Sequence, residues 1–136
     1  MLATQNDRLR NPDLAALILR VTLGGLFLAH AGLKIVVFTP AGTAQFFGSI
    51  GLPGGLAYPV IAAELLGGIA LIIGLQVRLV ALALVPLMLG TIIFSHGANG
   101  FFFNNQGGGW EYPAFWAIAL IVQALIGPGA AAITKE

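Results

Sequence analysis

The sequence contains no cysteine and few charged residues. Without cysteine, the chain carries no disulfide, thiolate zinc site, iron–sulfur cluster or covalently attached c-type haem. Charged residues make up 8% of the 136 positions, against roughly 25% in a typical soluble domain. From Val21 to Trp110 the charges are Lys34, Glu64 and Arg78. This excludes a soluble globular enzyme, a disordered chain and a nucleic-acid binder, which needs a clustered basic face. The composition predicts an integral membrane protein in a lipid bilayer.

Long apolar runs suggest how the chain crosses that bilayer. A spanning helix needs about 20 mainly apolar residues, and four segments reach or approach this length: about 13–37, 57–76, 78–96 and 112–127. Asn11 and Pro12 suit the cap and first position of the first helix. We therefore expect an all-α fold, with residues 1–136 forming a single integral membrane domain, a four-transmembrane-helix bundle.

The two longer loops are unusually apolar. Thr39 and Pro40 read as a cap and first helical position, so we expect a short interfacial helix between the first two spanning helices, ending near residues 48–51. The loop over residues 97–111 holds three consecutive phenylalanines and Trp110. Such a loop is expected to dip into the membrane or cover the mouth of the bundle.

Basic residues near the helix ends predict the orientation. Arg8, Arg10, Arg78 and Lys135 lie on one side of a four-helix protein, and Lys34 lies near a helix end on the other. The positive-inside rule then places both termini in the cytoplasm. The alternative, a cleaved signal peptide ending near residues 29–31, is disfavoured because the apolar run is longer than a signal sequence uses.

Several ionisable residues are expected to converge in the outer half of the bilayer. At 1.5 Å per residue, His30 and Glu64 both lie about 10 Å below the outer surface, with Lys34 one turn above His30. His96 lies at the outer end of the third helix and Glu111 at the outer start of the fourth. Ionisable groups inside a membrane are functional-site candidates because they are costly to bury.

Structural roles are the alternative for each of these residues. Glu64 paired with Lys34 or a histidine need only neutralise a buried charge, and Lys34 and Glu111 could reach the headgroups. Arg20, in the inner half, either extends toward the inner surface or meets Gln123 of the fourth helix. Glycine pairs at 24–25 and 67–68 are expected to let the first two helices pack closely.

The polar set limits the chemistry. Histidine with a carboxylate can move protons near neutral pH, and His30, Glu64, His96 and the phenylalanine loop could hold a quinone head group. A haem ligated by His30 and His96 is disfavoured because their expected depths differ by about 10 Å. Gly107–Gly109 lacks the Lys-Ser/Thr of a phosphate-binding loop. No set of metal ligands is assigned.

Short motifs along residues 13–129 resemble the DoxX family. They are residues 19–27 (LRVTLGGLF) with Lys34, 51–53 (GLP), 64–68 (ELLGG), 74–78 (GLQVR), His96 with 100–102 (GFF), Glu111, and 127–129 (GPG). The resemblance implies a small four-helix protein of the bacterial inner membrane, described in the family as an oxidoreductase or redox-complex subunit. Relatives include the membrane part of a thiosulfate:quinone oxidoreductase. The family's recurring polar positions coincide with Arg20, Lys34, Glu64, Arg78, His96 and Glu111, whereas His30 lies outside the motif.

Two functions follow as hypotheses. The first is a redox-associated membrane subunit that binds a quinone, or passes electrons to one, together with a partner oxidoreductase. Its catalytic candidates are Glu64, His96 and Glu111, and its substrate-binding candidates are Arg20, His30, Lys34, Phe102 and Trp110. The alternative is a non-enzymatic membrane anchor, assembly factor or small carrier, which is consistent with the lack of cysteine and of any soluble domain.

Overall fold

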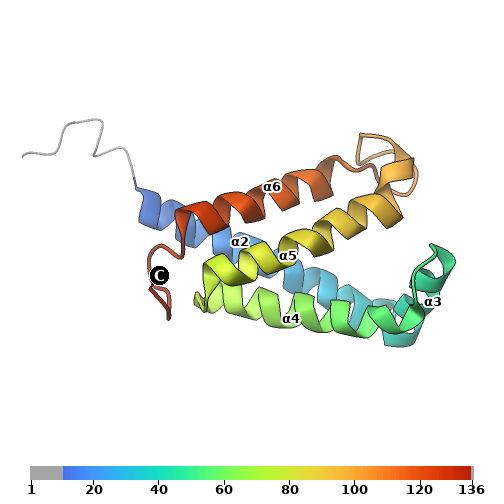
Figure 1. Cartoon of the computed structure of the whole chain (residues 1–136), viewed down its shortest axis with the longest axis horizontal. Helices are drawn as coiled ribbons and strands as arrows, with labels where there is room; N and C mark the ends of the chain where they lie inside the picture. The colour runs from blue at the N-terminus through green and yellow to red at the C-terminus, as the bar shows by residue number, and fades with distance from the viewer. Residues whose placement is uncertain (1–10, 136) are drawn as a thin grey trace, which may run out of the picture.

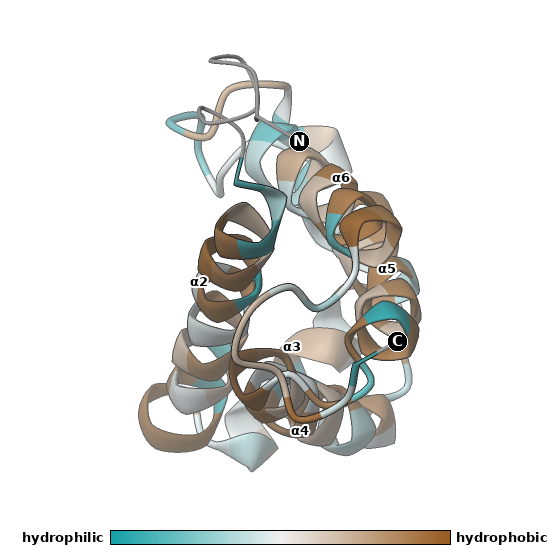
Figure 2. Ribbon diagram, turned by 90° about the vertical axis from the view of Figure 1, so that its left-hand side faces the viewer, coloured by the Kyte–Doolittle hydropathy of each residue, from teal (hydrophilic) through white to brown (hydrophobic). Residues whose placement is uncertain are grey.

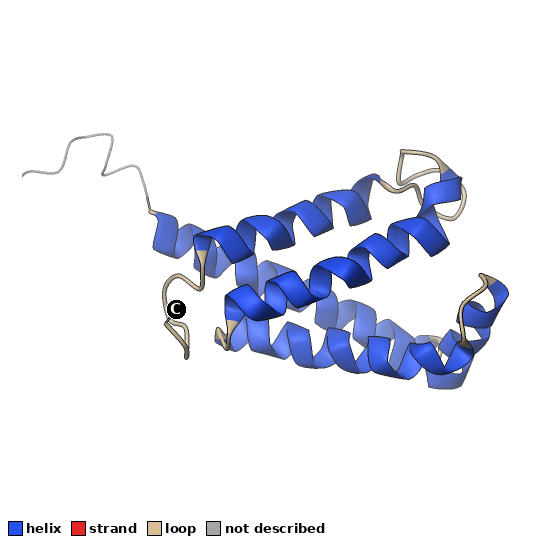
Figure 3. Cartoon of the chain, in the orientation of Figure 1, coloured by secondary structure: helices blue, strands red, loops and turns tan. Residues whose placement is uncertain are grey.

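The computed structural model describes residues 11–135, and this part of the chain is all-α, as predicted (Figure 3). The elements follow in order: α2 (Pro12–Gly32) with the π-helical turn η1 (Leu33–Val37), α3 (Pro40–Ser49), the 3-10 turn η2 (Gly54–Leu56), α4 (Ala57–Ile73), α5 (Val77–Thr91) with η3 (Ile92–His96, π) and η4 (Gly97–Asn99, 3-10), and α6 (Glu111–Ile126). The turns η1 and η3 continue the helices that precede them, so α2 and α5 are lengthened at the same end of the molecule.

Three helical runs are long and apolar enough to cross a membrane: Pro12–Val37 with 26 residues, Gly54–Ile73 with 20 and Val77–Asn99 with 23. The helix Glu111–Ile126 is apolar but shorter, at 16 residues. Many large apolar side chains point outward; Leu66 is 65% exposed and Phe115 73%. Lipid contact requires an outward-facing apolar surface, so these helices are those of a multi-pass membrane protein.

Local sequence signals start and stop these helices. The Asn11 side chain accepts a hydrogen bond from the backbone N–H of Leu14 at 3.1 Å, directly before Pro12. Thr39 caps α3 in the same way, accepting from the N–H of Gly42 at 3.1 Å. The predicted short helix after Thr39 is therefore present. α4 ends at Gly74, whose φ of +78° is readily adopted by glycine.

The long helices associate mainly as two pairs, α2 with α4 and α5 with α6. The first pair is close because glycine faces glycine: a Cβ atom on Gly24 would lie 2.6 Å from the carbonyl oxygen of Gly68. Gly67 instead faces Leu84 of α5, and Gly25 has no described atom near its open side. The close packing predicted for the first two helices thus depends on Gly24 and Gly68. Figures 1 and 2 show the pairs on opposite sides of the molecule.

The C-terminal tail folds back across one end of the bundle. The N–H of Ala130 donates to the carbonyl of Asp13 at 3.1 Å, and the N–H of Thr134 donates to the carbonyl of Gly74 at 3.0 Å. The start of α2, the α4–α5 link and the tail therefore share one end (Figure 1). Arg78 lies in the first turn of α5 at this end, whereas Arg8 and Arg10 lie outside the described residues.

Candidate functional site

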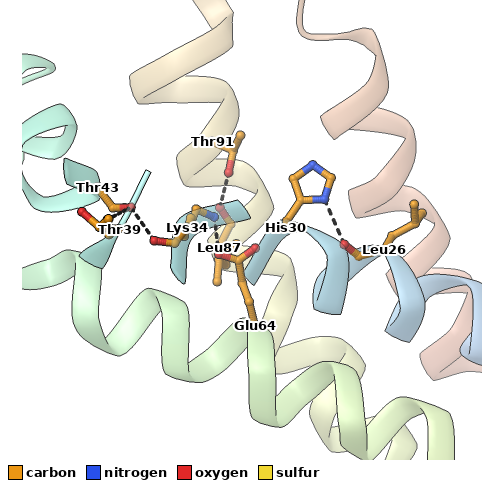
Figure 4. A network of polar contacts seen from close by, with 8 residues as sticks. All are labelled: Leu26, His30, Lys34, Thr39, Thr43, Glu64, Leu87 and Thr91. Atoms are coloured by element: carbon orange, nitrogen blue, oxygen red, sulfur yellow. Dashed lines mark hydrogen bonds and ion pairs between the residues drawn. The ribbon is translucent and has the colours of Figure 1, made fainter. Parts of the chain in front are cut away.

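A charged pair lies between α2 and α4 at the opposite end of the bundle. The ammonium group of Lys34, in η1, contacts the carboxylate of Glu64 directly. The Glu64 side chain is 3% exposed and that of Lys34 is 21% exposed. Figure 4 shows the two side chains reaching toward each other from facing helices. A buried carboxylate in an apolar bundle is stabilised by such a partner, because the pair carries no net charge.

Lys34 and His96 both lie in π-helical turns, η1 and η3. In η1 the N–H of Phe38 bonds the carbonyl of Leu33 at 2.9 Å, and in η3 the N–H of Gly97 bonds that of Ile92. Such turns accommodate an extra residue and rotate the following side chains, and they are frequent at functional sites. Helical periodicity alone does not predict the directions of these two side chains.

His30 lies on α2 one turn before Lys34. Its Nδ1 atom is 2.9 Å from the carbonyl oxygen of Leu26 (Figure 4). A carbonyl oxygen only accepts, so Nδ1 carries the hydrogen and, in the neutral ring, Nε2 is an acceptor. The ring packs edge-on against Trp116 of α6, with centroids 4.9 Å apart. His30 therefore joins α2 to α6, and in the neutral ring its Nε2 atom can accept a hydrogen bond.

His96 joins the end of α5 to α6 and the loop between them. Its Nδ1 atom is 2.8 Å from the carbonyl oxygen of Gly108, and the hydroxyl of Tyr112 lies 2.8 Å from Nε2. By the same reasoning Nδ1 donates to Gly108, and the Tyr112 hydroxyl donates to Nε2. Gly108 has a φ of +79°, a conformation that side chains other than glycine's rarely tolerate. The glycine run after the phenylalanines thus brings a backbone carbonyl to His96.

These groups surround a cavity of about 480 Å³, lined from both helix pairs and from α3. Its lining is mostly aliphatic and aromatic, including Phe46, Phe47 and Pro86. The side chains that bring polar atoms to it are His30, Lys34, Glu64, Thr91, Ser95, His96, Tyr112 and Trp116. A mainly apolar cavity with a few converging polar groups is typical of a small-molecule site.

The cavity brings together His30, Lys34, Glu64 and His96 from the residues singled out in the sequence. Three other candidates do not line it; they belong to the α5–α6 loop and its junction with α6. Glu111 accepts a hydrogen bond from the backbone N–H of Phe103 at 3.3 Å, Trp110 packs on Phe101 with centroids 4.9 Å apart, and Phe102 is 61% exposed.

Arg20 lies on α2 nearly three turns before His30 and does not line the cavity. It is fully buried, and its guanidinium donates to the carbonyls of Leu71, Ile72, Pro128 and Ala130 at 2.6–3.0 Å. Two of these acceptors are at the C-terminal end of α4, where the helix dipole favours a cation. Arg20 therefore fastens the tail to α4. Gln123 donates through Nε2 to carbonyls of Ala16 and Gly127, and its buried Oε1 atom has no hydrogen-bond partner among the described residues, so no Arg20–Gln123 bond forms.

Two cavity residues of α6 were not chosen from the sequence as site residues, Tyr112 and Trp116. They are four apart, so they lie one above the other on one helix face. That spacing is a signal, but an aromatic pair near a helix end also fits a membrane-interface role. Their contacts with His96 and His30 favour a role in the site over one at the membrane interface. Those contacts depend on the packing of α6 against α2 and α5, which the spacing alone does not give.

Within residues 11–135 the structure gathers no group of three or more His, Asp or Glu side chains that could hold a metal ion. The side chains of His30, Lys34, Glu64, Thr91, His96 and Tyr112 instead form an ion pair or hydrogen bonds with one another and with the backbone, whereas the indole N–H of Trp116 has no partner within this part of the chain. Such a set suits an uncharged organic molecule with hydrogen-bonding oxygens.

The chain is 41% identical over 81 residues to a Bacillus subtilis (strain 168) protein named "Putative oxidoreductase CatD". The alignment covers 60% of this chain and 59% of that protein, so it spans less than two thirds of the relative's length. No solved structure matches the chain. The DoxX family model matches residues 15–97, more than half of the chain, including Lys34, Glu64 and His96 but not Tyr112 or Trp116. The chain therefore belongs to the DoxX family.

Proposed function

We propose that this protein is a redox-associated subunit of the bacterial inner membrane that binds a quinone head group in the cavity and works with a partner oxidoreductase. The observation that carries the proposal is the buried Lys34–Glu64 pair, which opens onto a largely apolar cavity with two hydrogen-bonded histidines. Quinones need this combination, because the ring is apolar and the two carbonyls accept hydrogen bonds and protons.

In this proposal four helices cross the membrane, with α3 at the outer interface and both termini in the cytoplasm. Because α6 has 16 residues, it spans about 24 Å, somewhat less than the roughly 30 Å of hydrocarbon. Its outward face is apolar: Ile118 is 58% exposed and Leu125 73%. A slightly thinned bilayer or the flanking aromatic residues would cover the difference. Arg78 lies in the first turn of α5 and Lys135 follows Thr134, which bonds the carbonyl of Gly74 at the same end, so both support the orientation.

The chain's own residues would bind the quinone and handle protons. Reduction to the hydroquinone takes two electrons and two protons, and we propose that the electrons come from the partner oxidoreductase. The Lys34 ammonium can donate one proton to a quinone oxygen and take a replacement from the aqueous phase, because its side chain is 21% exposed, while Glu64 stabilises the restored cation. The second proton also comes from the aqueous phase. Tyr112 and His96 form a second hydrogen-bonded pair at the cavity wall. The name of the Bacillus subtilis relative, an oxidoreductase, supports this class of chemistry.

The test is quinone binding by the purified protein in lipid nanodiscs, using menadione as the probe. We expect saturable binding by the unaltered chain and a loss of at least tenfold in affinity on Glu64→Gln, because the amide leaves Lys34 unpaired beside the ligand. Asp13→Asn is the matched control, since Asp13 is an exposed carboxylate at the far end of α2. Absence of saturable binding, or an equal effect of both variants, would overturn the proposal.

A non-enzymatic anchor or carrier is the second candidate, supported by the exposed phenylalanines of the loop after α5. Phe101, Phe102 and Phe103 are 47–65% exposed, and an exposed apolar cluster can dock a partner. Such a protein would hold its partner at the membrane independently of the cavity. The test is a pull-down of the partner with each variant. Recovery of the partner with Glu64→Gln, its loss with Phe102→Ser, and an absence of quinone binding would together favour this function over the first.

A further inference from the structure

The indole N–H of Trp116 is a buried donor without an acceptor. Trp116 is 7% exposed and lines the cavity, and its Nε1 atom has no hydrogen-bond partner among the described residues. An N–H group withdrawn from water and left unbonded costs free energy, so buried tryptophans usually find an acceptor. The Nε1 atom has less than 1 Å² of accessible surface, so a molecule bound in the cavity supplies that acceptor by displacing a side chain that lies beside the indole.

The ring is fixed from two sides. Phe27 packs against it with centroids 4.8 Å apart and a tilt of 52°, and the edge of His30 lies 4.9 Å away at 70°. The indole ring is therefore held against α2 before any ligand arrives. Two other polar groups of the cavity are engaged: the Tyr112 hydroxyl bonds His96, and the His30 Nδ1 bonds a backbone carbonyl.

The charges of the cavity select an uncharged ligand. Lys34 and Glu64 neutralise each other, and Arg20 is held by backbone carbonyls elsewhere. A ligand with a net charge would need an additional counter-ion in a low-dielectric site. What the Trp116 donor requires is a neutral molecule with an exposed acceptor oxygen.

Building on the proposed function, we propose that Trp116 donates a hydrogen bond from Nε1 to a carbonyl oxygen of the quinone head group and so acts as a specificity residue. Its indole distinguishes a carbonyl-bearing ring from a hydrocarbon ring of the same size. A buried donor left unpaired beside a hydrocarbon penalises that ligand, whereas apolar contact alone would accept both.

The direct test is the indole N–H signal. The chain has two tryptophans, so Trp110→Phe leaves Trp116 as the sole source of an indole ¹⁵N–H resonance. Titration of this variant in nanodiscs with menadione is expected to move the indole proton downfield, as a new hydrogen bond does. The compound 2-methylnaphthalene keeps the ring but lacks both carbonyls, so titration with it is expected to give no downfield shift of the indole proton. Equal responses to the two compounds would overturn the proposal.

Affinity gives an independent readout in the same Trp110→Phe background. Trp116→Phe keeps an aromatic ring and removes the donor, so menadione affinity should fall about tenfold, the size of one hydrogen bond, while 2-methylnaphthalene affinity stays within twofold. Equal losses for both ligands would mean that the indole only packs against them, and an unchanged menadione affinity would likewise overturn the inference. If menadione affinity is unchanged by Trp116→Phe but still falls on Glu64→Gln, the inference about Trp116 fails and the proposed function stands.

Discussion

At the scale of single residues, the molecule is organised around polar atoms that find partners inside an apolar bundle. Lys34 pairs with Glu64, His96 is held between a backbone carbonyl and Tyr112, and Arg20 bonds backbone carbonyls. Each removes a polar group from contact with lipid, which is why these residues are tolerated at all. Because these groups are paired, loss of one partner leaves the other buried and unbonded.

The Lys34–Glu64 pair provides a stability prediction at this scale. Lys34→Met is expected to lower the free energy of unfolding by about 3 kcal/mol, since the carboxylate of Glu64 remains buried without a counter-charge. The double variant Lys34→Met/Glu64→Leu should recover most of the loss, because both charges are then gone. Denaturation in mixed detergent micelles measures both, and a double variant less stable than the single one would contradict the account.

At the scale of elements, two features set the site: the close approach of α2 to α4, and the π-helical turns that end α2 and α5. The first depends on backbone contact between Gly24 and Gly68. The second places Lys34 and His96 at positions that a regular helix would orient differently. Both act over several residues, so a change remote from the cavity is expected to disturb it.

Gly24→Ala tests the helix contact. Its Cβ would lie 2.6 Å from the Gly68 carbonyl oxygen and 2.7 Å from Ile72 Cγ1, so α2 and α4 must separate. We expect a loss of about 1–3 kcal/mol in stability. Gly25→Ala is the matched control, because no described atom lies within 4 Å of its added methyl, and alanine is the better helix former. Thermal unfolding of the two variants side by side checks the difference; equal melting temperatures would contradict it.

At the scale of the whole molecule, the two ends of the bundle have different roles. At one end the tail crosses the start of α2 and the end of α4 and is fastened by Arg20. At the other, the helix pairs and α3 surround the cavity. Closing one end with backbone hydrogen bonds fixes the helix pairs relative to each other while the other end holds a cavity.

The tail closure gives a prediction at this scale. Arg20→Met leaves carbonyls of α4 and the tail without their donor, so stability should fall by about 3 kcal/mol or more. Faster hydrogen exchange is expected at the amides of Ala130 and Thr134, which bond across this end. Lys135→Met is the control, since Lys135 is exposed. Unchanged exchange at these amides in Arg20→Met would show that the tail is held by its own hydrogen bonds.

Much of the fold could be predicted because it depends on local rules. Asn11-Pro12 and Thr39-Pro40 start helices with caps that act within three residues, and Gly74 ends one through its own backbone conformation. The site was harder to predict from the sequence. Glu64 and Lys34 stood out because charge is rare in this chain, whereas Trp116 did not, since an indole near a helix end has an ordinary explanation in a membrane protein.

The sequence by itself determined that this is an apolar, helical, multi-pass chain, because composition, helix length and caps are properties of contiguous residues. Its short motifs gave the resemblance to the DoxX family, and the family match over residues 15–97 shows the membership. Only the tertiary structure decided which polar residues share a cavity. It separated Arg20 and Glu111 from Glu64 and His96, and it joined Tyr112 and Trp116 to the histidines. The physical reason is that helix pairing, π-helical turns and tail docking set side-chain directions through contacts between residues far apart in the chain.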